Sequence, residues 1–423
     1  MWLKIKKLKY MKQDIIIGLD FGSSAVRIAV GQEDETVERG SVHIIGATEI
    51  QTSGIHRGVV TSIDDAVTTL STCIERAERI VGAPIERVYV GITGNHIIFQ
   101  PSKGFASVAR ADGEITDSDV GRAMDAAKTV PIPTNHEILH VLPKGFTIDG
   151  QVGIKDPIGM TGIRLEVDTC IIQGAKTQIK NITNSIFRTG VEIEGLIFSI
   201  LATADAAVTP RQKEIGVLVA NIGASTTSLI VFEEGDVVHT SVLPVGSEHI
   251  TSDIAIGLRT SIDVAERIKT EIGTALPENI NKKDVINLRD FGGLEDEMVS
   301  RRFVAEVIEA RTEEIFDKIN AQLKSIGRNG LLPGGAVLTG GGSKLAGITD
   351  VAKKILKLPA LLGYPLSITG NTDKINDLAF TTAIGLVLWG KEKRSSEHNF
   401  SGRFNMVGKT AKRIKDWFGS IMP

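Results

Sequence analysis

The 423-residue sequence has two cysteines and no long uninterrupted apolar run. Cys73 and Cys170 lie far apart and form no CxxC pair, so neither a disulfide framework nor a cysteine zinc site is expected. No run reaches the roughly 18 apolar residues of a membrane-spanning helix, so no such segment is expected. The net charge of −3 lacks the basic excess of a nucleic-acid-binding domain, and nucleic acid is therefore not expected as a partner.

The composition is that of a globular protein, with 42% hydrophobic and 23% charged residues. Because single cores stop growing at roughly 250 to 300 residues, the length predicts two or more lobes. The basic start, MWLKIKKLKYMKQD, has apolar residues interrupted by lysines and no small-residue cleavage site, so it is not expected to be a signal peptide. The low cysteine content fits a reducing cytoplasm.

Two glycine-containing turns repeat at a constant offset of 201 positions. DFGSSAVRIAVG (20–31) and NIGASTTSLIVF (221–232) each join two apolar runs, and each predicts a β-hairpin. Glycine lets the backbone approach a ligand closely, and the amides and hydroxyls around it can donate to phosphate oxygens. Either turn alone would be an ordinary hairpin, but the pair predicts two clasps on one phosphate chain. The residues predicted to bind phosphate are Gly22, Ser23, Ser24, Gly223, Ser225, Thr226 and Thr227.

An acidic residue ends the first predicted strand, but an amide takes the corresponding place in the second. Asp20 is predicted to hold Mg²⁺ through bound water, since magnesium keeps several waters and takes few protein ligands. Asn221 can hydrogen-bond at the second turn but brings no negative charge.

Two further elements complete a nucleotide-binding pattern. GAVLTGGGSKLAGI (335–348) reads as a strand, a glycine run and a helix start, and Gly340, Gly341, Gly342 and Ser343 are predicted to receive a purine. Glu266 and Lys269 lie three residues apart on a predicted helix and face the same way. The four elements, in this order, resemble the actin-like ATPase superfamily. The resemblance implies ATP and Mg²⁺ as cofactors, with Glu266 and Lys269 at the ribose and base.

Three short motifs suggest other chemistry and are set aside. HEILH (136–140) matches the HExxH zinc motif, but the surrounding prolines leave little room for a helix, and a strand would put consecutive side chains on opposite faces. GLVLWGKE (385–392) has a glutamate where a P-loop needs a hydroxyl, and GRFNMVGKT (402–410) has one residue too many between its glycines.

The segment between the two turns is similar to one family within the superfamily. GITGNHIIFQPSKGFASVAR and the following residues through CIIQGA resemble the inserted subdomain of the bacterial cell-division FtsA family, and LPVGSEHITSDIAIGLRTSIDVAERIKTEIG resembles its entry into the second lobe. The resemblance implies an α/β, two-lobed actin-like fold with an FtsA-type inserted subdomain and a C-terminal amphipathic helix. The expected units are 14–92 with 178–210 (first-lobe core), 93–177 (inserted subdomain), 211–250 with 333–390 (second-lobe core), 251–332 (smaller second-lobe subdomain), 391–408 (flexible linker) and 409–423 (membrane-targeting helix).

The last residues, KTAKRIKDWFGSIMP, predict a helix that lies in a membrane interface. Its apolar residues recur at helical spacing and form one stripe, while most basic residues lie elsewhere and face anionic lipid. The alternative is a terminal helix packed on its own domain, against which the polar segment before it argues. The residues predicted to contact the membrane are Lys412, Arg413, Ile414, Trp417, Phe418 and Ile421.

Slow or absent ATP hydrolysis is expected. In the actin-like superfamily that the sequence resembles, the second turn usually begins with an Asp, and here Asn221 takes its place. Members that hydrolyse ATP also carry a Glu or Gln that orients the attacking water. The corresponding segment here, SILATADAAV (199–208), has Leu201 or Ala202 at that position and Asp205 as its one acid. No catalytic residue is therefore assigned.

The family resemblance implies a polymerising, peripheral adaptor at the cytoplasmic face of the cell membrane, at the division site. Its implied partners are the C-terminal peptide of FtsZ, docked within 251–332, further copies of itself, anionic lipid and other division proteins. The alternatives are a PilM-like scaffold of a pilus or secretion assembly and an actin-fold ATPase or kinase.

Overall fold

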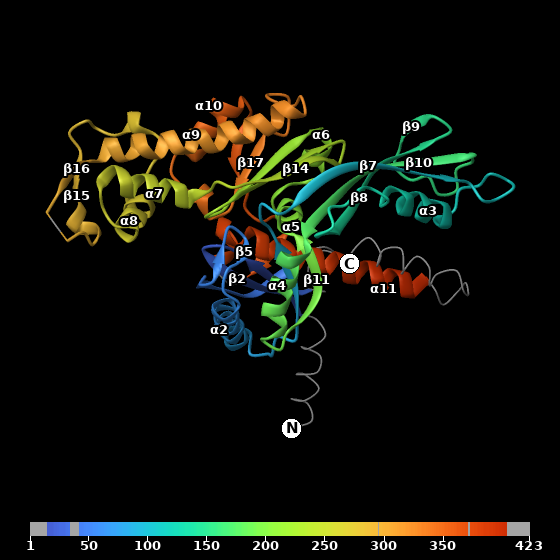
Figure 1. Ribbon diagram of the computed structural model, residues 1–423, viewed down its shortest axis with the longest axis horizontal. Coiled ribbons are helices and arrows are strands. Elements are labelled where there is room, and N and C mark those ends of the chain that lie inside the picture. The colour runs from blue at the N-terminus through green and yellow to red at the C-terminus, as the bar shows by residue number, and fades with distance from the viewer. Residues whose placement is uncertain (1–14, 34–41, 295, 371–372, 404–423) are drawn as a thin grey trace, which may run out of the picture.

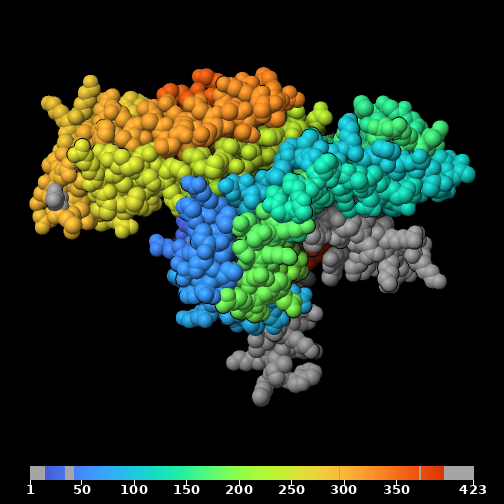
Figure 2. Space-filling model, in the orientation of Figure 1, coloured from blue at the N-terminus to red at the C-terminus, as the bar shows by residue number. Residues whose placement is uncertain are grey.

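The computed structural model describes residues 15–33, 42–294, 296–370 and 373–403, with side chains described as far as Arg394. Two lobes and a third, inserted unit give the molecule a T-like outline (Figure 1). The two lobes are built on a six-stranded and a five-stranded sheet, and the inserted unit on a four-stranded sheet. In Figure 2 the inserted unit, cyan to green, extends away from the second lobe, which is yellow to orange.

The first lobe is a mixed sheet in the order β11-β6-β1-β2-β3-β19 with helices on both faces. β1 and β2 are antiparallel, whereas β6 runs parallel to β1. Ala-rich and branched apolar side chains from both faces form its core. Its elements are β1 (Ile15–Phe21), β2 (Ala25–Glu33), β3 (Val42–Gln51), β4 (Ile55–His56), β5 (Val59–Val60), α2 (Ile63–Val81), β6 (Arg87–Ile92), α4 (Lys176–Phe187), β11 (Glu192–Phe198) and α5 (Ser199–Ala207).

The second lobe repeats this plan with the sheet order β14-β13-β12-β17-β18. β12 and β13 form the second antiparallel hairpin, and β17 runs parallel to β12. A smaller subdomain of helices and one two-stranded sheet extends from it (Figure 1). The elements are α6 (Pro210–Ile215), β12 (Val217–Ile222), β13 (Thr227–Glu233), β14 (Asp236–Leu243), α7 (Ser247–Leu258), α8 (Ile262–Ile272), η1 (Pro277–Asn279), β15 (Val285–Asn287), η2 (Leu288–Phe291), β16 (Met298–Ser300), α9 (Arg301–Ser325), β17 (Ala336–Thr339), η3 (Gly341–Lys344), α10 (Ile348–Leu356) and β18 (Ala360–Leu362).

The inserted unit is an antiparallel sheet in the order β7-β10-β8-β9, covered by one helix and closed around its own apolar core. It contacts both lobes. His140 Nε2 accepts the backbone N–H of Phe198 in the first lobe at 2.9 Å, and Lys155 Nζ lies 2.6 Å from Asp236 Oδ2 in the second. The elements are β7 (Ile98–Ser107), α3 (Asp117–Ala127), β8 (His136–Ile148), β9 (Gln151–Ile154) and β10 (Arg164–Ala175).

The chain returns to the first lobe after β18, which corrects two predicted boundaries. β19 (Ile368–Gly370) joins the first-lobe sheet beside β3, and α11 (Thr381–Arg403) packs on β1, β2 and α5. The prediction that residues 333–390 all belong to the second lobe is therefore wrong beyond β18. The two short helical turns on the way are η4 (Asp373–Asn376) and η5 (Leu378–Phe380).

Two glycines allow this close return. A Cβ on Gly18 would lie 2.1 Å from the carbonyl oxygen of Ala383, and a Cβ on Gly385 would lie 2.0 Å from that of Ala202. Either contact is far shorter than van der Waals separation, so a larger residue would push α11 off the sheet and off α5.

The predicted linker at 391–408 is also corrected in its first part, because α11 continues through Arg403. Arg394 anchors this part of the helix by donating to the carbonyl of Ile15 and pairing with Glu194. The remaining linker residues and the predicted membrane residues Lys412, Arg413, Ile414, Trp417, Phe418 and Ile421 lie outside the described residues. Of the described helices, none is long and apolar enough to cross a membrane.

Candidate nucleotide site

Both predicted hairpins are present, and both turns need glycine at the predicted position. A Cβ on Gly22 would lie 2.7 Å from the Ala25 carbonyl oxygen, and one on Gly223 would lie 2.9 Å from that of Thr226. Neighbouring segments hold the first turn, since Ser23 Oγ accepts the N–H of Gly58 at 2.9 Å. The tight turns therefore leave their backbone close to the space between the lobes.

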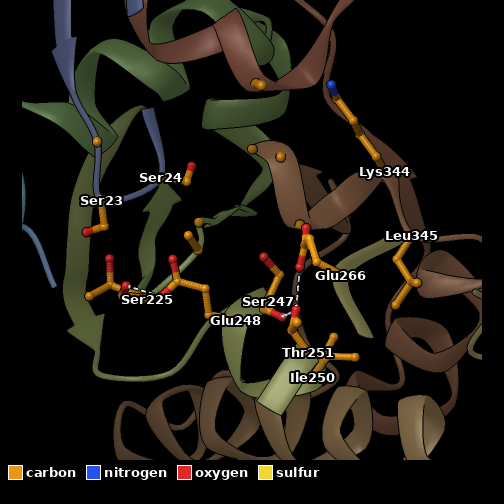
Figure 3. Close-up of a pocket in the computed structure, with 18 of the residues that line it drawn as sticks. Ser23, Ser24, Ser225, Ser247, Glu248, Ile250, Thr251, Glu266, Lys344 and Leu345 are labelled. Carbon is orange, nitrogen blue, oxygen red and sulfur yellow. Dashed lines mark hydrogen bonds between the residues drawn. The ribbon is translucent and has the colours of Figure 1, made fainter. Parts of the chain in front are cut away.

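That space is a cavity of about 1010 Å³ between the lobes (Figure 3). Its volume is at the upper end of the roughly 300 to 1,000 Å³ that ligand sites enclose. Both hairpin turns, the glycine run and helix α8 line it. The predicted site residues that line it are Asp20, Gly22, Ser23, Ser24, Asn221, Gly223, Ser225, Thr226, Glu266, Lys269, Gly340, Gly341 and Gly342.

Two predicted residues, Thr227 and Ser343, do not line the cavity, which corrects the prediction for their hydroxyls. The Thr227 hydroxyl donates to the carbonyl of Val245 at 2.8 Å, and the Ser343 hydroxyl donates to that of Thr339 at 2.6 Å. Both residues are buried. Thr227 begins strand β13, where successive side chains point to opposite faces, and Ser343 lies in the helical turn η3. In both places the side chain points into the protein interior rather than into the cavity.

Asp20 brings a carboxylate of the first hairpin to the cavity. Burial raises the pKa of Asp20 to about 6, and the charge of Arg27 opposes the rise. Arg27 is its direct partner across the β1–β2 hairpin and also lines the cavity. Across the described ranges there is no group of three or more His, Cys, Asp or Glu side chains that could hold a metal by themselves. One carboxylate among serine hydroxyls nevertheless fits magnesium, which takes few protein ligands and completes its shell with water and phosphate oxygens.

Asn221 is built into a chain of polar side chains. Its Nδ2 donates to the Thr382 hydroxyl at 3.0 Å, and Thr382 pairs with Thr203 at 2.9 Å. Its Oδ1 lies over the glycine run, where a Cβ on Gly340 would approach it to 2.2 Å. Gly340 also has a φ of 85°, in the region that favours glycine. The asparagine thus ties the second turn to α11 and to the glycine run.

Glu266 and Lys269 face one another on α8, as their spacing predicts. Lys269 Nζ lies 2.6 Å from Glu266 Oε2 and 2.7 Å from the Thr251 hydroxyl. Thr251 in turn donates to Glu266 at 2.5 Å (Figure 3). A second carboxylate, Glu248, accepts the Ser225 hydroxyl at 2.6 Å across the second turn (Figure 3). These bonds fix donors and acceptors along one wall before any ligand enters.

Several lining residues were not predicted. Arg27 was detectable, because a hairpin that turns between Phe21 and Val26 places it directly opposite Asp20. Lys344 follows the glycine run and forms an ion pair with Asp377 at 2.5 Å. Glu248 and Thr382 belong to none of the motifs singled out in the sequence, and tertiary packing brings them to the cavity.

The crossover into α5 differs from its predicted alignment. Leu201 and Ala202 are buried and do not line the cavity, whereas Ser199 does. Asp205 is paired with Lys213 on α6. The helix therefore presents its first residue to the cavity, rather than Leu201 or Ala202.

The two competing motifs within the described chain have structural roles. HEILH lies in strand β8, as predicted, and its second histidine, His140, is a buried acceptor rather than a free ligand. GLVLWGKE lies inside helix α11 and forms no loop.

Comparison with protein families gives two matches. Residues 218–385 match the family described as "Cell division protein FtsA", and residues 94–173 match the family described as "SHS2 domain inserted in FTSA". The second range contains β7, α3, β8, β9 and most of β10, which is nearly all of the inserted unit.

Curated relatives are similar over nearly their whole length. The chain is 36% identical to cell division protein FtsA of Pseudomonas aeruginosa over 387 residues, which is 92% of each chain. It is 34% identical to FtsA of Bacillus subtilis over 88% of this chain and 83% of the relative. It is 32% identical to FtsA of Escherichia coli K12 over 97% of this chain and 99% of the relative.

Solved structures with the same fold are more distant in sequence. A PilM–PilN type IV pilus biogenesis complex matches with a TM-score of 0.63 and 16% identity, over 89% of this chain and 98% of the other. MreB5 of Spiroplasma citri bound to ADP matches with a TM-score of 0.54 and 13% identity, over 92% and 99%. The predicted two-lobed, actin-like α/β fold with its inserted subdomain is confirmed.

Proposed function

Because the chain belongs to the FtsA family of cell division proteins, we propose that it is an ATP-binding, polymerising adaptor that joins the division machinery to the membrane. It acts at the division site, on the cytoplasmic face of the membrane. It binds the C-terminal peptide of FtsZ through residues 251–332, associates with further copies of itself and recruits other division proteins.

The observation that supports ATP binding is the cavity between the two hairpin turns. Its hydroxyls and glycine backbone suit phosphate, and its α8 wall offers a paired lysine and glutamate. MreB5 of Spiroplasma citri, which shares the fold, has been solved bound to ADP and to AMPPNP. Asp20 would hold Mg²⁺ through water, and the bound ion would neutralise phosphate charge. Arg27, directly across the hairpin from Asp20, pairs with Glu49 at 3.1 Å, so it adds little net positive charge to the phosphate end.

Hydrolysis is slow or absent in this proposal. Asn221 contributes an amide rather than a carboxylate, and its Nδ2 is already used by Thr382. At the start of α5 the cavity meets the hydroxyl of Ser199, and α5 carries no Glu or Gln that could orient an attacking water. ATP then serves as a ligand that favours the closed, polymerising state.

Membrane attachment rests on the sequence of the last residues. Burying one large apolar side chain contributes roughly 1.5 to 3 kcal/mol, and a basic residue near anionic lipid contributes roughly 1, but ordering a short helix offsets much of this. One tail therefore binds weakly. Several tails on one polymer bind strongly, because each later attachment is effectively intramolecular.

Flotation with anionic liposomes tests the adaptor function. We expect the intact chain to float, more so with ATP, and a chain truncated after Val407 to stay in the soluble fraction. Trp417→Glu is the full-length counterpart of the truncation, since it leaves the length unchanged and disrupts the apolar stripe. If the intact chain stays soluble even at low salt, the membrane proposal is refuted, and a PilM-like scaffold becomes the better description.

An exposed apolar patch within residues 251–332 supports the docking of a peptide there. Ile256 on α7 is exposed, and the partly exposed Phe303 on α9 would lie 3.6 Å from a Cβ on Gly257, the residue after Ile256. We expect Ile256→Lys to weaken binding of a labelled FtsZ C-terminal peptide in fluorescence anisotropy. Val152→Lys, on the inserted unit and equally exposed at 75%, is the matched control. Equal loss in both variants, or none in Ile256→Lys, contradicts docking at this patch.

A further inference from the structure

One buried hydroxyl at the cavity has no partner. Ser199 begins α5, lines the cavity and is 2% exposed. Within the described part of the chain its Oγ makes no hydrogen bond. A buried hydroxyl without a partner costs free energy, so its presence at a ligand cavity points to an acceptor that the ligand supplies.

The position of Ser199 places it beside the first phosphate turn. Its Oγ lies over Gly91, where a Cβ would approach it to 2.7 Å. Gly91 on β6 is in turn the parallel partner of Asp20 on β1. The serine is therefore one strand away from the predicted magnesium site.

The same residue is linked to the second phosphate turn. Thr203 donates to the Ser199 carbonyl at 2.8 Å and pairs with Thr382, which accepts the amide of Asn221. Ser199 is thus linked to both Asp20 and Asn221, each of which lies one residue before the end of the first strand of its hairpin. Phosphates clasped by both turns would meet the start of α5 from the cavity side.

The start of α5 has a second feature suited to an anion. The first amides of a helix have no acceptor within it, and the helix dipole gives that end a partial positive charge. Of this first turn, Ser199 lines the cavity, whereas Leu201 and Ala202 do not. The unpartnered Ser199 hydroxyl is therefore the donor at this helix end that a phosphate group in the cavity can meet.

We propose that Ser199, at the start of α5, binds the terminal phosphate of a nucleoside triphosphate, so that the site distinguishes ATP from ADP. This inference rests on the proposed nucleotide binding and adds to it the group that recognises the third phosphate.

The test compares two nucleotides on three proteins by calorimetry, with magnesium present. For Ser199→Ala we expect the affinity for the non-hydrolysable analogue AMPPNP to fall about tenfold or more, as loss of a hydrogen bond to a charged group predicts, while ADP affinity stays within about twofold. Ser185→Ala is the matched control, because that buried hydroxyl donates to the Asn181 carbonyl in α4. It should bind both nucleotides as the unmodified chain does.

The outcomes separate this inference from the function it rests on. If the unmodified chain binds neither nucleotide, the proposed ATP binding fails and the inference with it. If the unmodified chain binds both nucleotides, and Ser199→Ala either keeps both affinities or lowers both equally, ATP binding stands and the role of Ser199 is overturned. Thermal unfolding without nucleotide checks the fold: Ser199→Ala should unfold no earlier than the unmodified chain, because it removes an unpartnered buried polar group.

Discussion

One buried histidine should leave a measurable mark on the pH dependence of stability. His140 joins the inserted subdomain to the first lobe, where its Nε2 accepts the backbone N–H of Phe198 and its ring lies beside Trp389. Burial lowers the pKa of His140 from 6.5 to about 4. Protonation of the ring would remove the acceptor and leave a charge in an apolar contact.

The size of the effect follows from the two pKa values. Between pH 6.5 and pH 4 the unfolded chain binds a proton at this residue that the folded chain does not. The free energy of unfolding therefore falls as pH falls, by about 1.4 kcal/mol per pH unit. From pH 7.5 to pH 5 the loss from His140 alone is about 2 kcal/mol, and below pH 4 this residue adds no further loss.

Urea denaturation of the unmodified chain and of His140→Gln, at pH 7.5 and pH 5, measures this loss. Glutamine can keep an acceptor near the position of Nε2 but does not titrate. We expect the drop in unfolding free energy to be smaller in the variant by about 2 kcal/mol. His96 and His239, whose pKa values burial also lowers, are present in both proteins and cancel. An equal drop in both proteins would refute the assigned role of His140.

Two other substitutions test the site and the packing of α11. Asn221→Asp restores a negative charge toward magnesium, and phosphate release should rise by about tenfold or more; unchanged turnover would remove the account of slow hydrolysis that depends on Asn221. Gly385→Ala puts a Cβ 2.0 Å from the Ala202 carbonyl oxygen and should lower the unfolding free energy by about 1 to 3 kcal/mol. Gly145→Ala, whose Cβ would meet nothing closer than 3.7 Å, should not, and similar losses in both would contradict the close-packing argument.

The parts of the fold that could be predicted are those with a local cause. Each hairpin shows two apolar runs around a glycine turn, and the repeat of that pattern marks both sides of the cavity. Asp20 and Asn221 end their strands at equivalent places, so their position at the cavity follows from the register. The α8 pair follows from helical spacing.

The parts that could not be predicted depend on contacts between distant segments. Nothing local in α11 indicates that it packs against β1 and α5, because these close approaches depend on Gly18 facing Ala383 and on Gly385 facing Ala202. The side chains of Thr227 and Ser343 turn away from the cavity because carbonyls of Val245 and Thr339 accept their hydroxyls. Thr382 and Asn221 are hydrogen-bonded although they lie 161 positions apart in sequence, and no sequence spacing predicts such a bond.

Helix α11 makes a mechanical connection between two ends of the molecule. Its first residues, Thr381 and Thr382, bond to the glycine-run strand and to Asn221, and its last described residue is Arg403. At 1.5 Å per residue this rod is about 35 Å long. Arg394 and the packing on β1, β2 and α5 hold this helix along the first lobe, so a pull on the chain beyond Arg403 is resisted by these contacts before it reaches the Thr382–Asn221 bond at the cavity. The first lobe therefore carries tension from the C-terminal segment, and the cavity lies at the far end of the helix that receives it.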